Sequence, residues 1–79
     1  MNRYYYTFGT DPAFPYKKGW VEVRANTMKE ADEKFRRRFP DRPGHEGTLN
    51  CAFVYGEARW AEMNPEANWP GWRCFETIE

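Results

Sequence analysis

The fold is decided by residues 19–39, which read GWVEVRANTMKEADEKFRRRF. In the first part of this stretch, apolar Val21 and Val23 alternate with charged Glu22 and Arg24. This period of two is typical of a strand with one buried face, because successive side chains of a strand point to opposite sides of the sheet. The sequence therefore predicts a strand with one face in the core and one face available.

A helix follows this strand directly. Thr27 precedes Glu30 by three residues, the spacing of a capping box, in which the hydroxyl accepts a hydrogen bond from the backbone and the carboxylate reaches back. Pro40 is predicted to end the helix. One apolar stripe, with spacings of three and four residues, runs along it: Met28, Ala31, Phe35 and Phe39.

Shorter signals predict the other elements. Strands are expected over residues 3–8, 49–55 and 72–78, and a short second helix over residues 57–63. The order β-β-α-β-α-β predicts one α+β domain, residues 1–79, with a three- to four-stranded, mainly antiparallel sheet and the main helix across one face. Because residues 49–55 are apolar on both faces, that strand is expected in the centre of the sheet or at an interface.

Composition narrows the class of protein. Aromatic residues make up 19% of the chain and the formal net charge is zero, which indicates an aromatic core and argues against general nucleic-acid binding. No apolar run is long enough to span a bilayer, and the N-terminal residues lack the apolar core of a signal peptide, so a cytoplasmic location is expected. Cys51 and Cys74 are therefore expected to be reduced, buried thiols.

If one helix covers the sheet, its other face is left to solvent, to a ligand or to a second copy. The residues predicted on that face are Arg3, Tyr5, Trp20, Glu22 and Arg24. Interleaved aromatic and arginine side chains stack bases and hold phosphates. The same mixture is typical of protein interfaces, and equally of aromatic pairs that merely pack across strands.

Three further groups invite a functional interpretation. Arg36–Arg38 and Arg42 form a basic cluster that suits phosphates or an acidic partner, or simply compensates the helix dipole. Trp69 and Trp72 lie in a rigid turn that suits either a pocket wall or a small satellite core. His45 is expected to be exposed in a loop, since no metal-ligand spacing surrounds it. No catalytic set is visible, so neither an enzyme nor a cofactor is predicted.

Three runs of the sequence carry a resemblance: YYYTFGTDPAFPYKKGWVEVRA at residues 4–25, FPDR at 39–42 and LNCAFVYGEARW at 49–60. Together they resemble small proteins encoded by bacteriophages and prophages. The matched positions are Phe8, Gly9, Asp11, Pro12, Pro15, Gly19, Trp20, Val21, Phe39, Pro40, Asp41, Arg42, Leu49, Asn50 and Cys51. The resemblance implies an accessory role in a phage or mobile element, a class that includes inhibitors of host defence. It assigns no activity to named residues.

Two functions are therefore expected. The first is a non-enzymatic, self-associating binding protein, acting as a host-defence antagonist, that sequesters a nucleotide-derived ligand. Its ring-stacking residues would be Tyr5, Trp20 or Trp72, and its phosphate-binding residues Arg3, Arg24, Arg42 or Arg73. The alternative is a protein-binding inhibitor, similar in action to anti-CRISPR proteins, that occludes a host nuclease or effector through the same face.

Overall fold

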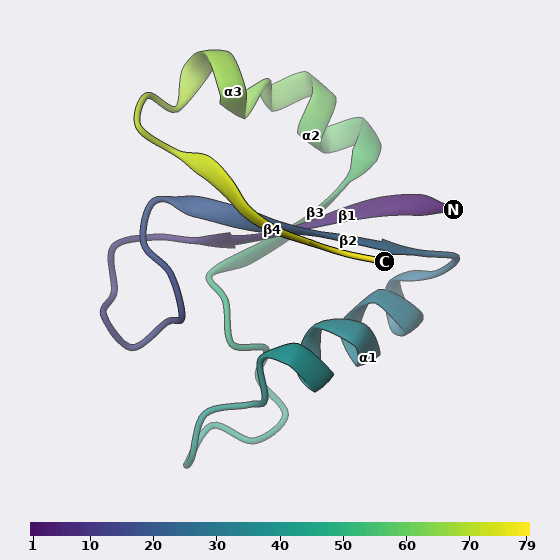
Figure 1. Cartoon of the computed structure of the whole chain (residues 1–79), viewed down its shortest axis with the longest axis vertical. Helices are drawn as coiled ribbons and strands as arrows, with labels where there is room; N and C mark the ends of the chain where they lie inside the picture. The colour runs from purple at the N-terminus through teal and green to yellow at the C-terminus, as the bar shows by residue number, and fades with distance from the viewer.

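The computed structural model describes all residues, 1–79, and has one mixed four-stranded sheet between two helical layers (Figure 1). The strands are β1 (Asn2–Phe8), β2 (Gly19–Ala25), β3 (Phe53–Gly56) and β4 (Arg73–Ile78), in the spatial order β3-β1-β2-β4. β1 is antiparallel to β2 and to β3, whereas β2 and β4 are parallel. Helix α1 (Met28–Arg38) covers one face, and α2 (Glu57–Met63) and α3 (Pro65–Asn68) cover the other. The predicted α+β class is confirmed.

The first core lies between the sheet and α1. Tyr6 and Phe8 of β1 pack with Val21 and Val23 of β2, as the alternation of both strands predicts. The side chain of Phe35 reaches them from α1 and stacks on Tyr6 with ring centroids 4.3 Å apart. Nine buried residues form this core: Tyr6, Phe8, Val21, Val23, Ala25, Ala31, Phe35, Phe39 and Cys51.

The start of α1 is capped as predicted. The Thr27 hydroxyl accepts a hydrogen bond from the Glu30 amide at 3.1 Å, and the Glu30 carboxylate accepts one from the Asn26 amide. The helix ends at Arg38, with Phe39 as its C-cap, before Pro40. Of the predicted apolar stripe, Met28 lies at the exposed start of the helix, so the buried contacts begin one turn later.

The third strand is shorter than predicted and is not central. β3 begins at Phe53, and it occupies one edge of the sheet beside β1. Its two apolar faces are used at this edge, because Val54 packs against the first core while Tyr55 packs against aromatic residues of the opposite layer. Cys51 lies before the strand and is buried, whereas Cys74 is exposed, which corrects the prediction that both thiols are buried.

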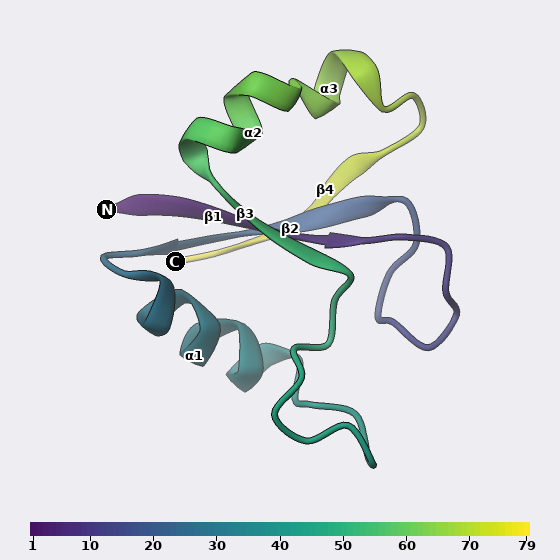
Figure 2. The ribbon, with the colours of Figure 1, turned by 180° about the vertical axis from the view of Figure 1, so that it is seen from behind.

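The second face of the sheet is covered, contrary to the prediction of an open face. β3 and β4 lie at opposite edges, so the chain between them must cross the sheet, and α2 and α3 lie in that crossing (Figure 2). Trp60, the buried residue of α2, packs on Tyr5 and Trp20 to form the second core. No helix of this chain has the length and apolar character needed to cross a membrane.

Candidate functional site

The largest pocket opens on the second face and is lined mainly by aromatic and apolar residues. It encloses about 470 Å³, within the range of small-molecule sites, and its lining has no charged side chain. We call it the aromatic pocket. Its lining residues are Thr7, Gly9, Ala52, Phe53, Tyr55, Asn68, Trp69, Pro70 and Trp72.

Two separate parts of the chain form the walls of the aromatic pocket. One wall is the β1–β3 edge, where the Ala52 amide donates to the Thr7 carbonyl at 2.7 Å. The other wall is the segment from α3 to β4, where the Trp72 amide donates to the Trp69 carbonyl and the two indole rings meet at 4.9 Å. A left-handed glycine, Gly71 with φ of 81°, allows that turn, which brings both indoles to the sheet edge.

A second, more polar pocket lies beside the second core and encloses about 310 Å³. It brings together three predicted site residues, Arg3, Tyr5 and Trp20. Two of these cannot offer a free ring face, because Tyr5 and Trp20 are only 8% and 4% exposed. Trp60 stacks flat on Tyr5 at 4.3 Å and meets Trp20 edge-on at 5.0 Å. The rings that the sequence marks for a ligand are thus covered by the protein itself.

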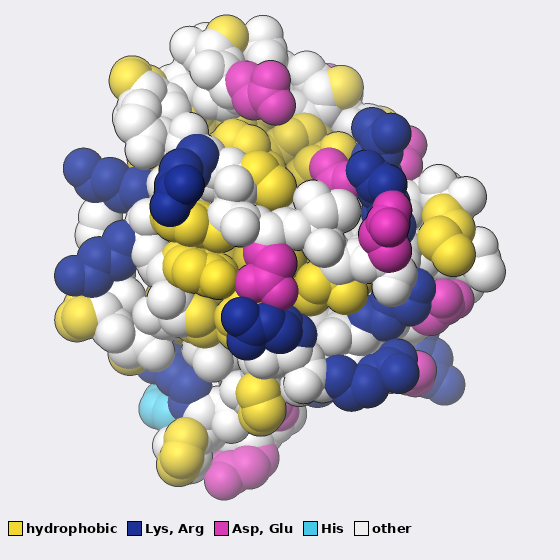
Figure 3. All heavy atoms as spheres, viewed as in Figure 1, with side chains coloured by type: hydrophobic (Ala, Val, Ile, Leu, Met, Phe, Trp, Pro, Cys, Tyr) yellow, Lys and Arg dark blue, Asp and Glu magenta, His cyan; other side chains and the backbone are white.

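Burial of Tyr5 favours the protonated form of its hydroxyl. Burial raises the pKa of Tyr5, and the carboxylate of Glu22 raises it further, while Arg3 acts in the opposite direction. The lining of this pocket also includes the exposed Cys74 from β4 and Glu66 from α3. Figure 3 shows apolar side chains in the hollow between the α2–α3 layer and β4.

The other four predicted site residues are dispersed. Arg24 forms ion pairs with two carboxylates, those of Glu22 at 3.0 Å and Glu79 at 2.6 Å. Trp72 lines the aromatic pocket. The structure therefore does not bring all seven predicted residues to one site.

The guanidinium groups of Arg42 and Arg73, the last two of these residues, each stack on an aromatic ring. Arg42 lies over Phe14 at 4.7 Å, and Arg73 lies over Phe75 at 4.4 Å. They belong to different regions, since Arg42 follows α1 whereas Arg73 begins β4 beside the aromatic pocket residue Trp72. Neither forms an ion pair, so each keeps an uncompensated charge.

Two of the four arginines in the basic cluster, Arg36 and Arg38, are neutralised by ion pairs, whereas Arg37 and Arg42 form none. Arg36 pairs with Asp41 at 2.9 Å and Arg38 pairs with Glu76 at 2.8 Å. Arg36 and the Gly47 amide hold the pKa of Asp41 below its usual value. This pairing favours the interpretation of the cluster as a structural charge network.

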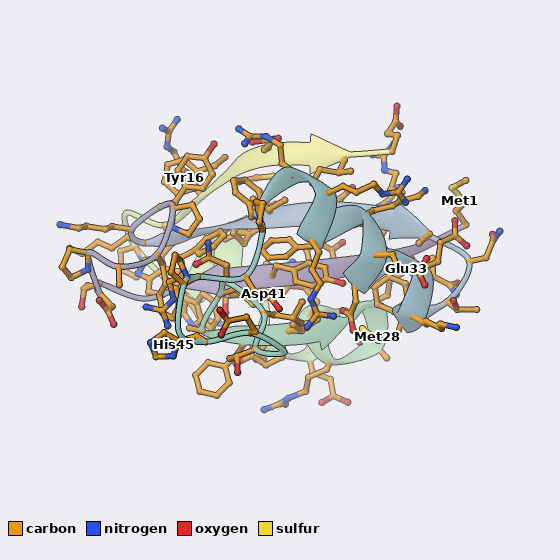
Figure 4. The ribbon with its side chains drawn as sticks, turned by 90° about the horizontal axis from the view of Figure 1, so that it is seen from below. Met1, Tyr16, Met28, Glu33, Asp41 and His45 are labelled. Atoms are coloured by element: carbon orange, nitrogen blue, oxygen red, sulfur yellow. The ribbon has the colours of Figure 1, made fainter.

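His45 is exposed in the loop that follows Asp41, as predicted. In the view from the α1 side, His45 lies toward the margin of the molecule, whereas Asp41 lies nearer the middle (Figure 4). No group of three or more histidine, cysteine, aspartate or glutamate side chains is placed to hold a metal ion.

Sequence reasoning missed three residues of the aromatic pocket: Thr7, Phe53 and Asn68. Phe53 is 65% exposed, an unusual state for a phenylalanine, but its exposure depends on the edge position of β3. Asn68 follows the Asn-Pro pair that starts α3, and this pair was the one local signal that a helical turn interrupts the loop. Thr7 shares the face of β1 that carries Arg3 and Tyr5, because side chains two residues apart in a strand point the same way.

Comparisons with known proteins add no relative: no protein-family model matches this chain, and neither the curated proteins nor the solved structures contain a match.

Proposed function

We propose that this chain is a non-enzymatic binding protein that captures a nucleotide-derived ligand, in the accessory, anti-defence role implied by the resemblance to phage proteins. The observation that carries the proposal is the aromatic pocket, with four rings in an uncharged lining. Flat aromatic walls bind the π-face of a base, and such stacking contributes about 1–3 kcal/mol per base. The base would enter this pocket and not the covered surface of Tyr5 and Trp20.

The ring pairs of the pocket suit this role. Phe53 and Tyr55 meet at 6.3 Å on the sheet wall, and Trp69 and Trp72 meet at 4.9 Å on the other wall. The two indoles, which are in closer contact, lose little side-chain freedom when a ligand binds, whereas the exposed Phe53 would be ordered by the ligand. The indole wall is thus organised for a flat ring before that ring arrives.

The charged part of the ligand would lie outside the lining. Backbone hydrogen bonds connect Lys18 to the pocket residue Gly9 and to Arg73, which follows Trp72. Neither Lys18 nor Arg73 forms an ion pair, so both charges are free to meet phosphate. Figure 3 shows Lys and Arg side chains gathered along the margin of the molecule beside the β1–β2 loop and the start of β4.

Native mass spectrometry of protein purified from cells tests the proposal first, because it reports the bound mass and the oligomeric state together. We expect an added mass of a few hundred daltons that is lost on denaturation. The released ligand should absorb ultraviolet light as a nucleobase does. Variants Trp69→Leu and Trp72→Leu keep an apolar side chain, although a smaller one, and remove the flat face, so they should lose that mass. Retention of the ligand by both variants would show that it binds elsewhere.

A matched pair of arginine variants tests the phosphate side. Arg73→Gln and Arg42→Gln each remove a guanidinium that stacks on a phenylalanine, but only Arg73 adjoins the aromatic pocket. We expect Arg73→Gln to weaken the binding of a nucleotide about five- to tenfold, while the corresponding nucleoside binds as before. Arg42→Gln should change neither. Equal effects of the two variants would remove Arg73 from the site.

A second function, inhibition of a host nuclease or effector by direct binding, is favoured by one observation. β3 is an edge strand without a charged residue, and Phe53 projects from it largely exposed. Exposed aromatic residues beside an unpaired strand edge are typical of surfaces that bind another chain. A pull-down from host lysate that recovers one stoichiometric protein, lost in Phe53→Ser, would favour this function over ligand capture. Self-association through the same edge would appear as a dimer in the native mass spectrum.

A further inference from the structure

The aromatic pocket contains two polar side chains that are not aromatic, Thr7 and Asn68. They come from opposite walls, since Thr7 belongs to β1 and Asn68 is the last residue of α3. Polar groups that are few and fixed in an apolar pocket usually orient the ligand and set its specificity. Their hydrogen-bonding state therefore indicates which ligands the pocket prefers.

Thr7 retains only acceptor capacity. Its hydroxyl donates its single hydrogen to the Phe53 carbonyl at 3.1 Å, and its residue is only 3% exposed. A hydroxyl has one hydrogen and two lone pairs, so once that hydrogen is engaged the oxygen can only accept.

Asn68 contributes an acceptor and also a donor, because its amide nitrogen carries two hydrogens and only one of them is engaged within the protein. Its Nδ2 donates to the Met63 carbonyl at 2.8 Å, which fixes the side-chain amide, and no protein group donates to its Oδ1. The amide oxygen is therefore a second acceptor without a partner. The lining also has donors, in the indole N–H groups of Trp69 and Trp72, neither of which donates to a protein group.

We infer that the aromatic pocket selects a heteroaromatic ring bearing an exocyclic amino group, an aminopurine or aminopyrimidine, over the corresponding keto ring. This inference rests on the proposed function. An amino group gives a hydrogen to Thr7 or Asn68, and the ring nitrogen beside it accepts from an indole. A keto oxygen placed against the Thr7 hydroxyl meets an acceptor, because the hydrogen of that hydroxyl is engaged by the Phe53 carbonyl, so its desolvation is not compensated there.

Two pairs of nucleosides isolate this difference: adenosine with inosine, and cytidine with uridine. Within each pair the ring skeleton is unchanged, but the exocyclic amino donor is replaced by a carbonyl acceptor, and the ring nitrogen beside it changes from an acceptor to an N–H donor. The four dissociation constants can be measured by quenching of tryptophan fluorescence and checked by calorimetry. A buried polar group left without a partner weakens binding by about tenfold or more. We expect that preference for the amino member in at least one pair.

Variants assign the preference to a residue. Thr7→Val keeps the shape of the side chain but removes the acceptor, so the preference should fall towards equal binding. Thr7→Ser restores the hydroxyl and should restore the preference. Wild-type protein gives a test that needs no variant: N6,N6-dimethyladenosine keeps the ring but lacks both donated hydrogens, and it should bind as weakly as inosine.

The outcomes separate the inference from the proposed function. If none of the four nucleosides binds, the assignment of the aromatic pocket to a base is wrong, and the inference is lost with it. If all four bind with equal affinity, base stacking stands and the selection by Thr7 and Asn68 is refuted. The same refutation follows if dimethyladenosine binds as well as adenosine.

Discussion

Truncation of Trp60 to alanine should detach α2 and α3 while leaving the first core folded. Trp60 is the one buried residue of α2, stacked on Tyr5 at 4.3 Å and edge-on to Trp20 at 5.0 Å. The first core contains no residue of α2 or α3. The interactions lost in Trp60→Ala therefore belong to one layer of the molecule.

The loss of stability in Trp60→Ala can be calculated from the surface that the indole buries. The indole buries about 150–200 Å², and at about 25 cal/mol per Å² its loss costs about 4–5 kcal/mol, in line with the roughly 3–5 kcal/mol that such truncations cost in protein cores. A domain of 79 residues has a total stability of about 4–12 kcal/mol. The loss is thus a large part of the total stability, and it falls on the second layer alone. Local opening of that layer is the expected response.

Hydrogen exchange followed by mass spectrometry measures this opening. Amides of residues 57–68 should exchange between about a hundredfold and a few thousandfold faster, because each 1.4 kcal/mol corresponds to a factor of ten. Amides of α1 should change much less. The control Trp60→Phe keeps a ring on Tyr5 and should lose only a fraction of the protection. Equal acceleration in α1 and α2 would refute the reasoning, since the two layers would then unfold as one unit.

Three other changes have defined outcomes. A methyl group at Gly19 would overlap the backbone carbonyl at the start of β4, so Gly19→Ala should lower the free energy of unfolding in urea by about 1–3 kcal/mol. Gly9→Ala, where the space is open, should cost far less. Similar urea midpoints for the two variants would contradict this prediction. The pKa of Asp41 is lowered from 3.8, so its stabilising contribution is present above pH 3.8 and is lost as the pH falls through the pKa of the folded state. The difference in melting temperature between wild type and Asp41→Asn should therefore shrink in that acidic range. A difference that does not change with pH would argue against the ion pair. Burial raises the pKa of Cys51 to about 12, so iodoacetamide at pH 8 should alkylate Cys74 in the native protein and Cys51 only after unfolding; two rapid additions to the native protein would show that Cys51 is accessible.

The face assignments of the first two strands could be predicted because side-chain alternation is a local property. Tyr6 and Val21 point to the first core, while Tyr5 and Trp20 point to the second, as the period of two requires. The bounds of α2 also agree with the predicted range 57–63. Short-range patterns decide these features, and no distant contact is needed to infer them.

Strand order could not be predicted, because it depends on contacts between distant residues. A strand with two apolar faces suits the centre of a sheet, but Val54 and Tyr55 satisfy both faces at the edge. Leu49 and Cys51 approach the α1 side as part of a loop and were counted as strand residues for their apolar character.

The location of the candidate site also depends on the strand order. With β3 and β4 at opposite edges, the connecting chain brings Trp60 over Tyr5 and Trp20, so the residues predicted to stack a ligand stack on the protein instead. Both interpretations of the Trp69–Trp72 turn apply, since the two indoles pack against the second core and also line the aromatic pocket. The opposite wall of this pocket became visible only with the edge position of Phe53. A stretch of sequence shows which rings are present but not which of them are covered.

The parallel pairing of β2 with β4 has a consequence for how the protein folds. β1, β2 and α1 are neighbours in sequence and can associate early, whereas β4 joins β2 from the far end of the chain. Pairings between distant segments raise the contact order and form late, because the loop between them must first lose its entropy. Since the turn that ends at Trp72 leads directly into β4, the aromatic pocket is completed only when β4 has joined the sheet. A chain in which β4 has not yet paired with β2 therefore lacks one wall of its binding site.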